Sequence, residues 1–290
     1  TVHMTGTLSE HSQVAYSLLA PEERVLAFED DHVTVSQMRA LEAAMPDVRF
    51  VPMAQRPETL RAIKDEDEIA SITKACEISC LAFEHMLGAI KPGQTETEIR
   101  LELETALYRF GADKLAFDTI IAGGANGSLP HAVPGSYRVQ KGDFITMDFG
   151  ARVNGYCSDM TRTVALGAID TDKRRVYDTV LTAQLRALDA LKPGALCKAV
   201  DAVARDYIYE SGFEGRFGHG LGHCLGLDIH ESPRLSMSAG DAVLMPGHVI
   251  TVEPGIYRPG QDGVRIEDTC LITASGHRRL TPATKELIFL

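Results

Sequence analysis

The sequence has no excess of positive charge. Its 29 Lys and Arg residues are outnumbered by 40 Asp and Glu residues, so the net charge at pH 7 is −11. Nucleic acids and anionic membranes are therefore not expected as partners. The sequence also lacks a run of about 20 apolar residues, which a membrane-spanning helix requires. Its first residues lack the basic and apolar regions of a signal peptide.

Cysteine pairs at metal-binding spacing are missing as well. The six cysteines are scattered through the 290 residues, and none of them forms a CxxC pair. In a chain of this length, such cysteines indicate reduced thiols and a cytoplasmic protein, not a zinc ribbon or a disulfide framework.

What is present is the composition of a soluble globular protein, with 44% hydrophobic and 24% charged residues. Residues 1–56 resemble the remainder of a small α/β unit, with strands near Val25 to Phe28 and Val48 to Val51 and a helix over Val35 to Ala44. Pro57 then opens a helical region at a first-turn position. We therefore predict a short, incomplete N-terminal segment (1–56) and a second domain (57–290).

The second domain has a coarse internal symmetry. Helices are expected up to Phe110, and strands over Phe117 to Ala122, Phe144 to Phe149 and Tyr156 to Ala165. The last two are joined by Asn154-Gly155, a strong hairpin signal. Helices over Asp172 to Leu191 and Cys197 to Ser211 then precede strands over Val249 to Glu253 and Val264 to Thr273. Two similar halves that meet at one site would form a single large α+β domain.

The richest stretch for chemistry is His219 to Glu231, which holds three histidines and four glycines in thirteen residues. Glycines allow close approach of the backbone, and histidine is the commonest metal ligand and a proton carrier. The alternative for this stretch alone is a glycine-rich surface loop that happens to contain histidines.

Four carboxylates also lie in or beside apolar strands: Asp148, Asp159, Glu253 and Glu267. A buried carboxylate needs a partner, and a metal ion is the strongest one available. Taken singly, Asp148 and Asp159 could be edge-strand or turn acids, and Glu267 could pair with Arg265. Taken together with the histidines, they favour a metal site. Cross-strand pairing around Asn154-Gly155 would bring Asp148 and Asp159 together.

One histidine and four carboxylates form an oxygen-rich ligand set. Such a set favours Mn²⁺ or Co²⁺, with Fe²⁺ or a catalytic Zn²⁺ as alternatives, over a structural zinc ion. Five ligands, some of them bridging, suit two divalent metal ions about 3.5–4 Å apart.

Several motifs, in order, resemble those of the proline peptidases, namely Xaa-Pro dipeptidase (prolidase) and aminopeptidase P. They are Leu129-Pro130-His131-Ala132, Met147-Asp148-Phe149-Gly150, Tyr156 to Thr163, His219 to Glu231, Val252-Glu253-Pro254-Gly255-Ile256-Tyr257 and Val264 to Asp268. The resemblance runs from about residue 57 to the C-terminus. It implies the pita-bread fold of the creatinase and aminopeptidase group, with two halves related by a pseudo-two-fold axis.

The resemblance also implies a role for each matching residue. Asp148 would bind one metal ion, His223 and Glu253 the other, and Asp159 and Glu267 would bridge the two. Glu253 would carry the proton of the attacking water. The remaining matches would contact the substrate or lie beside the site: His230 at the substrate carbonyl, His131 and His219 at the substrate and proline pocket, and Tyr257 and Arg265 beside them.

The implied activity is that of a dinuclear metal-dependent exopeptidase that cleaves Xaa-Pro bonds at a free N-terminus of a di- or oligopeptide. The compact loop between His230 and Glu253 favours a prolidase, with an Xaa-Pro aminopeptidase as the alternative and a non-catalytic pita-bread binding module as a remoter one. Family members usually carry a much longer N-terminal domain that caps the site and contributes to a homodimer. Only about 55 residues precede the match here, so dimerisation and the limit on substrate length stay open.

Overall fold

The computed structural model describes residue 6, residues 8–20 and residues 24–290 of the chain. The parts of the predicted N-terminal segment formed by residues 1–5, 7 and 21–23 lie outside this description. The chain divides into two compact units, residues 1–60 and residues 61–290. This division and the boundary predicted from the sequence both fall within helix α3 (Arg56–Ala62).

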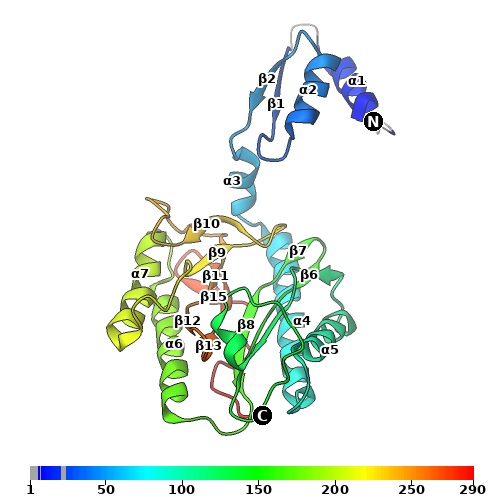
Figure 1. Cartoon of the computed structure of the whole chain (residues 1–290). Coiled ribbons are helices and arrows are strands. Elements are labelled where there is room, and N and C mark those ends of the chain that lie inside the picture. The colour runs from blue at the N-terminus through cyan, green and yellow to red at the C-terminus, as the bar shows by residue number, and fades with distance from the viewer. Residues whose placement is uncertain (1–5, 7, 21–23) are drawn as a thin grey trace. The chain divides into compact units, whose positions relative to one another are not determined.

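The first unit is a small α/β structure (Figure 1). Strands β1 (Val25–Phe28) and β2 (Arg49–Pro52) pair in parallel, with Val25 opposite Arg49. Helix α2 (Val35–Ala44) connects them and begins with a capping box between Thr34 and Gln37. These three elements match the sequence-based expectation. Helix α1 (Leu8–Leu18) was not expected, because its sequence has few apolar residues at helical spacing.

The first half of the second unit begins with two helices, and each has a capping box at its N-terminus. Its elements are α4 (Glu66–Ala89), α5 (Glu96–Arg109), β3 (Lys114–Leu115), β4 (Ile120–Gly123), the 3₁₀ turn η1 (Gly124–Ser128), β5 (Phe144–Phe149), β6 (Ala151–Val153), β7 (Tyr156–Cys157) and β8 (Met160–Ala165). The strands form two antiparallel sheets, β4-β5-β8 and β3-β6-β7.

The second half repeats the order of helices followed by strands. Its elements are α6 (Thr171–Ala190), α7 (Cys197–Ile208), the π turn η2 (Tyr209–Phe213), β9 (Gly222–Cys224), β10 (Glu231–Leu235), β11 (Val249–Val252), β12 (Gly255–Arg258), β13 (Asp262–Arg265), β14 (Asp268–Ile272) and β15 (His277–Arg279). A five-stranded sheet has the order β10-β9-β11-β14-β15, and β12 and β13 form a separate hairpin.

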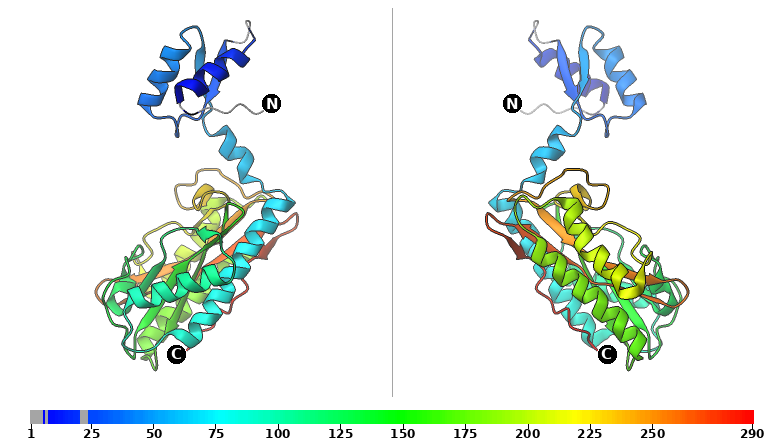
Figure 2. Two further views of the ribbon diagram at one scale, coloured as in Figure 1. Left: turned by 90° about the vertical axis from the view of Figure 1, so that its right-hand side faces the viewer. Right: turned by 90° about the vertical axis from the view of Figure 1, so that its left-hand side faces the viewer.

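The strands lie between two pairs of helices (Figure 1), and the two views in Figure 2 show α4 and α5 on one side and α6 and α7 on the other. Each pair of helices packs on its own hydrophobic core, one that includes Phe83 and Phe149 and one that includes Tyr177 and Ile250. Two halves with separate cores, facing each other across the strands, agree with the predicted symmetry. Within the described residues, no helix has the length and apolarity needed to cross a bilayer.

The structure corrects three of the predicted strands. The strand predicted over Tyr156 to Ala165 is broken at Ser158-Asp159, and the one over Val264 to Thr273 is broken at Ile266-Glu267. In both cases an acid occupies the break, so the chain leaves the ladder where it presents a carboxylate. The strand predicted from Phe117 begins only at Ile120. The helix predicted to reach Ser211 ends at Ile208 and continues as a π turn, in which Gly212 has a φ of 90°.

Candidate metal centre and active site

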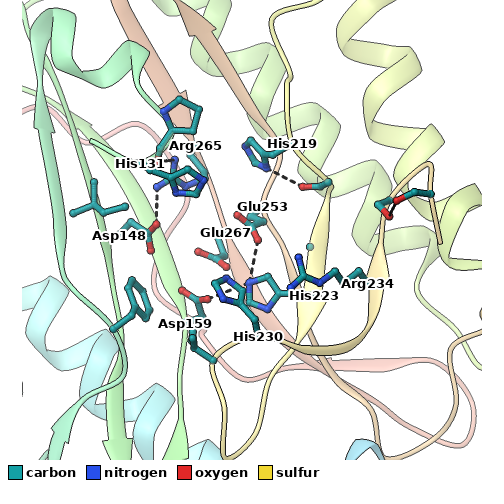
Figure 3. Close-up of a pocket in the computed structure, with 18 residues that line it drawn as sticks. His131, Asp148, Asp159, His219, His223, His230, Arg234, Glu253, Arg265 and Glu267 are labelled. Carbon is teal, nitrogen blue, oxygen red and sulfur yellow. Dashed lines mark hydrogen bonds and ion pairs between the residues drawn. The ribbon is translucent and has the colours of Figure 1, made fainter. Parts of the chain in front are cut away.

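All five residues predicted as metal ligands meet at one cavity of about 490 Å³ (Figure 3). They come from both halves of the second unit: Asp148 from β5, Asp159 from the residue before β8, His223 from β9, Glu253 from the residue after β11, and Glu267 from between β13 and β14. Figure 3 shows the four carboxylates turned toward one another, with the histidine ring beside them.

The distances within this group are short. Ligand oxygens of Asp148, Asp159 and Glu267 all lie within 4.8 Å of one another. The Nε2 atom of His223 lies 3.6 Å from Asp159 Oδ2 and 3.4 Å from Glu253 Oε1. The predicted approach of Asp148 to Asp159 is therefore present, although the strand register pairs Asp148 with Thr161.

Two glycines allow the backbone to bring these side chains together. A Cβ atom on Gly150 would lie 1.9 Å from the carbonyl oxygen of Ser158, at the bend between the two aspartates. A Cβ atom on Gly222 would lie 2.0 Å from the carbonyl oxygen of Thr251, where β9 passes β11. A side chain at either position would push apart the segments that carry the site residues.

The carboxylates repel one another. Burial, together with the charges of Glu267 and Asp148, raises the pKa of Asp159 well above its usual range. Burial and the neighbouring Glu253 and Asp148 raise the pKa of Glu267 in the same way. For Glu253, burial is again the largest cause, and its pKa is raised to about 8 even though Arg265 opposes the shift.

Two buried carboxylate oxygens, Asp148 Oδ1 and Glu267 Oε1, have no hydrogen-bond partner within the described part of the chain. Such atoms are costly unless something binds them. Unpaired oxygens, several carboxylates and one imidazole are the donor set that divalent cations such as Mn²⁺ or Co²⁺ prefer. The residues present therefore fit a divalent metal centre.

Hydrogen bonds orient the individual donors. Thr161 Oγ1 donates to Glu267 Oε2 at 2.7 Å, and Thr251 Oγ1 donates to Glu253 Oε1 at 3.2 Å. The Nδ1 atom of His223 lies 3.0 Å from the carbonyl oxygen of Cys224, which places the ring proton on Nδ1 and leaves Nε2 free to bind a cation. Burial lowers the pKa of His223 to about 3, so the ring is neutral.

A hydrogen-bonded chain borders the acids on one side. Arg265 Nη2 lies 2.6 Å from Asp148 Oδ2, and Arg265 Nη1 donates to the hydroxyl of Tyr257 at 2.9 Å. The same hydroxyl lies 2.7 Å from His219 Nε2. Arg265 thus pairs with Asp148 and not with Glu267, so the alternative considered for Glu267 is wrong. Arg265 also donates to the carbonyl oxygen of Pro130, in the loop that carries His131.

The remaining predicted residues also line the cavity (Figure 3). The ring of His230 packs edge to face on His223, with the centroids 4.4 Å apart. His131 is exposed at the cavity surface. Burial lowers the pKa of His230, and burial and Arg265 lower that of His219 to about 4. The histidines His219 and His230 are therefore neutral at physiological pH.

Sequence reasoning missed several lining residues, namely Phe117, Ile120, Ile229, Arg234, Ser236 and Ser238. Arg234 is the most consequential, because it is a cation and no ion pair within the described residues involves it. The sequence carries no clear signal for it, because a register shift between Glu231 and Arg234 interrupts the alternation along β10.

Comparison with known proteins identifies the family of this chain. The model of metallopeptidase family M24 matches residues 70–274, and that of the creatinase/prolidase N-terminal domain matches residues 5–63. The chain belongs to metallopeptidase family M24. This confirms the predicted metallopeptidase class, and the binding-module alternative is not retained.

Individual relatives of this M24 peptidase are named as Xaa-Pro peptidases. An Xaa-Pro dipeptidase of Pyrococcus furiosus is 47% identical over 229 residues, which cover 79% of this chain and 66% of the relative. The structure of an Xaa-Pro dipeptidase from Bacillus anthracis has a TM-score of 0.94 at 42% identity, covering 99% of this chain and 80% of that one. An X-Pro aminopeptidase from Thermotoga maritima has a TM-score of 0.92 at 37% identity, covering 100% and 81%. The predicted pita-bread fold and the resemblance to the proline peptidases are confirmed.

Proposed function

We propose that this M24 peptidase is an Xaa-Pro dipeptidase that uses two divalent metal ions. The observation that carries the proposal is the group of mutually repelling, partly unpaired carboxylates around His223, in a chain that is similar in sequence and fold to Xaa-Pro dipeptidases.

Five residues would hold the cations, as the motifs implied: Asp148, Asp159, His223, Glu253 and Glu267. When bound, the cations supply Lewis acidity and make a water molecule acidic enough to lose a proton at neutral pH. Mn²⁺ or Co²⁺ suits this oxygen-rich set best. The six buried, free cysteines support a reducing compartment, and we propose the cytoplasm.

The protein's own groups then move protons and orient the substrate. Glu253 takes a proton from the attacking water and delivers it to the proline nitrogen as the C–N bond breaks. His230, neutral and beside His223, donates a hydrogen bond to the substrate carbonyl oxygen, where negative charge develops. The chain from His219 through Tyr257 to Arg265 holds Asp148 and the wall of the pocket in place.

An Xaa-Pro bond calls for a dedicated pocket. Its nitrogen carries no hydrogen, so a peptidase that grips an extended backbone through that N–H loses a contact. The proline ring also restricts the residue before it. The apolar lining by Phe117, Ile120 and Ile229 suits an apolar first residue.

Arg234 favours the dipeptidase over the aminopeptidase. In an Xaa-Pro dipeptide the proline carries a free carboxylate. Arg234 lines the cavity and pairs with no acid in the described part of the chain, so it can bind that carboxylate. Ser236 and Ser238 line the same cavity and offer hydroxyl donors. A longer peptide places a neutral amide there, whose carbonyl oxygen forms a weaker hydrogen bond with a guanidinium than a carboxylate does.

Hydrolysis of a peptide panel with added Mn²⁺ or Co²⁺ tests the proposal. The panel contains an Xaa-Pro dipeptide, its C-terminal amide, an Xaa-Pro-Xaa tripeptide and a Met-Ala-Ser tripeptide. We expect cleavage of the dipeptide in preference to the others. Preferred cleavage of the Xaa-Pro tripeptide would indicate the aminopeptidase, and cleavage of only the Met peptide would overturn the assignment.

Arg234→Met sharpens the same test. Losing one charge-assisted contact should raise KM for the dipeptide about 10- to 100-fold and raise KM for the amide much less. Arg109→Met removes an exposed arginine at the end of α5 and serves as the control. Equal effects of Arg234→Met on dipeptide and amide would contradict carboxylate binding.

A further inference from the structure

A second group of charges lies beside the site and takes no part in the chemistry described above. It consists of Arg61, Lys64, Asp228 and Glu231, and we call it the loop clamp. Glu231 is at its centre: Lys64 Nζ lies 2.8 Å from one carboxylate oxygen and Arg61 Nη2 lies 2.6 Å from the other. Arg61 Nη2 also lies 2.8 Å from Asp228 Oδ2.

The central ion pair is buried. The side chain of Lys64 is 1% exposed and that of Glu231 is 8% exposed. The ammonium group also donates to the carbonyl oxygen of Ala62 at 3.3 Å, and the Lys64 backbone N–H donates to the carbonyl oxygen of Gly247. The turn between α3 and α4 is thus fixed, and it presents a cation to the loop that carries His230.

Gly226 packs directly against this pair. A Cβ atom there would lie 2.8 Å from Glu231 Oε1 and 2.9 Å from Lys64 Cε. A side chain at this position would push the ends of Lys64 and Glu231 aside, so the glycine lets the loop fold closely over the ion pair. The loop, the carboxylate and the lysine therefore form one close-packed unit.

The loop from Gly226 to Glu231 is held at its two ends. At the first end, the carbonyl oxygen of Gly226 accepts from the backbone N–H of Cys157, and that of Leu227 accepts from Arg152 Nη2 at 2.6 Å. At the other end, Glu231 Oε1 accepts from the backbone N–H of Asp228 at 3.2 Å, so its carboxylate closes the loop on itself.

Between these ends, Ile229 and His230 are held by fewer hydrogen bonds. Within the described part of the chain, neither residue makes a backbone–backbone hydrogen bond, and the His230 ring has no hydrogen-bond partner. The ring packs on His223, and the residue that follows it, Glu231, is held by the clamp.

We propose that the buried Lys64–Glu231 pair is a positioning device that holds His230 at the substrate carbonyl. The inference rests on the proposed function, in which His230 faces the developing oxyanion. Glu231 touches neither the substrate nor the cations in this scheme. Its carboxylate is too fully engaged by Lys64, Arg61 and the Asp228 N–H to take another role.

Removing the lysine charge tests the proposal. Lys64→Met keeps the aliphatic stem and leaves Glu231 without its buried partner, so the loop should shift. A displaced oxyanion donor should lower kcat about 10- to 100-fold with little change in KM. Lys74→Met is the matched control, since Lys74 pairs with Glu77 at 3.4 Å with both side chains more than half exposed. It should leave kcat unchanged.

A double-mutant cycle separates positioning from general damage. In a His230→Ala background, Lys64→Met should lower kcat less than about 2-fold, because the group it positions is already gone. The same fold-loss with and without His230 would overturn the proposal. Glu231→Gln keeps the shape and one acceptor, and it must show the same dependence on His230 if Lys64→Met does not fold.

A second readout does not depend on turnover. In the metal-free protein, the imidazole NMR signals of His230 should shift or broaden in Lys64→Met, whereas those of His277, which contacts Leu191, should not. Unchanged His230 signals would overturn the proposal. Altered signals in a protein that cleaves no Xaa-Pro peptide would leave the clamp standing and overturn the proposed function instead.

Discussion

Glu267 and Asp268 are consecutive residues and both are buried, yet the charges around them are opposite. Asp268 accepts from Arg162 at 2.8 Å, from Lys285 at 2.7 Å and from Gln184 at 3.0 Å. Burial alone would raise its pKa, but Arg162 and Lys285 outweigh burial and lower it. Glu267 faces Asp148, Asp159 and Glu253, and its pKa is raised.

The difference shows how to distinguish a structural acid from a ligand. The protein supplies the cations for Asp268, so that group, which we call the paired network, is complete as it stands. The carboxylates around Glu267, which we call the unpaired cluster, hold Arg265 as their cation and keep two oxygens without a hydrogen-bond partner among the described residues. Such a cluster is stable only when its protons are retained or when cations arrive.

The same Asp-to-Asn change in each of the two groups tests this contrast most directly. The largest expected effect is the loss of activity when the change is made in the unpaired cluster. Asp159→Asn removes a charge from the unpaired cluster, so one cation should be lost and kcat should fall about 1000-fold or more. The fold should be retained. Metal content and kcat on an Xaa-Pro dipeptide measure this, and wild-type turnover in the variant would contradict the assignment of Asp159.

The matching change in the paired network should act on stability. Asp268→Asn leaves Arg162 and Lys285 without their buried counter-charge and should lower the free energy of unfolding by about 3 kcal/mol. Urea denaturation of the metal-free protein at pH 8 measures it. Asp159→Asn, which relieves repulsion, should instead raise the free energy by about 1 kcal/mol under the same conditions. Changes of the same sign in both variants would contradict the contrast.

Much of the unpaired cluster was predictable, because each of its acids lies in or beside a short apolar strand. Asn154-Gly155 even predicted the approach of Asp148 to Asp159. The opposite charge environments of Glu267 and Asp268 could not be predicted from the sequence. Arg162 and Gln184 bind Asp268 from distant parts of the sequence, and no residue near Asp268 in the sequence indicates these partners.

The fold also has parts that could be predicted from the sequence and parts that could not. Helices were predicted up to Phe110, and the structure has α4 and α5 there. Their capping residues and apolar positions are local signals. The breaks at Ser158-Asp159 and Ile266-Glu267 were missed, since the apolar pattern continues across both. Arg234 was missed because its role depends on which face of β10 meets the cavity, which only tertiary packing decides.

The pH dependence of the metal-free protein should follow the unpaired cluster. Because the pKa of Glu253 is about 8 in the folded state and 4.5 for an unperturbed glutamate side chain, its contribution to stability is complete below about pH 4.5 and is lost as pH rises to 8. A shift of this size corresponds to a loss of about 4 kcal/mol across this window. Urea denaturation in EDTA at pH 5, 6.5 and 8 measures it.

Glu253→Gln provides the control for the pH effect, since glutamine does not titrate. Its stability should vary less across the window than that of the wild type. Added Mn²⁺ should remove the trend in the wild type, because cation binding needs the deprotonated carboxylates. Parallel curves for wild type and variant would mean that Glu253 does not carry the titration.

The smallest effect should come from the hydroxyl that orients Glu267. Thr161 Oγ1 donates to Glu267 Oε2 at 2.7 Å and accepts from Arg265 Nε at 3.1 Å, so Thr161→Val removes both contacts at nearly constant volume. Affinity for Mn²⁺ should fall about 10-fold, as is usual when a hydrogen bond to a ligand is lost. Thr105→Val, which removes only a bond to its own helix at Leu101, is the control for calorimetric titration. Equal affinities in the two variants would mean that the cations alone orient Glu267, and the contrast with Asp268 would then rest on charge and not on hydrogen bonding.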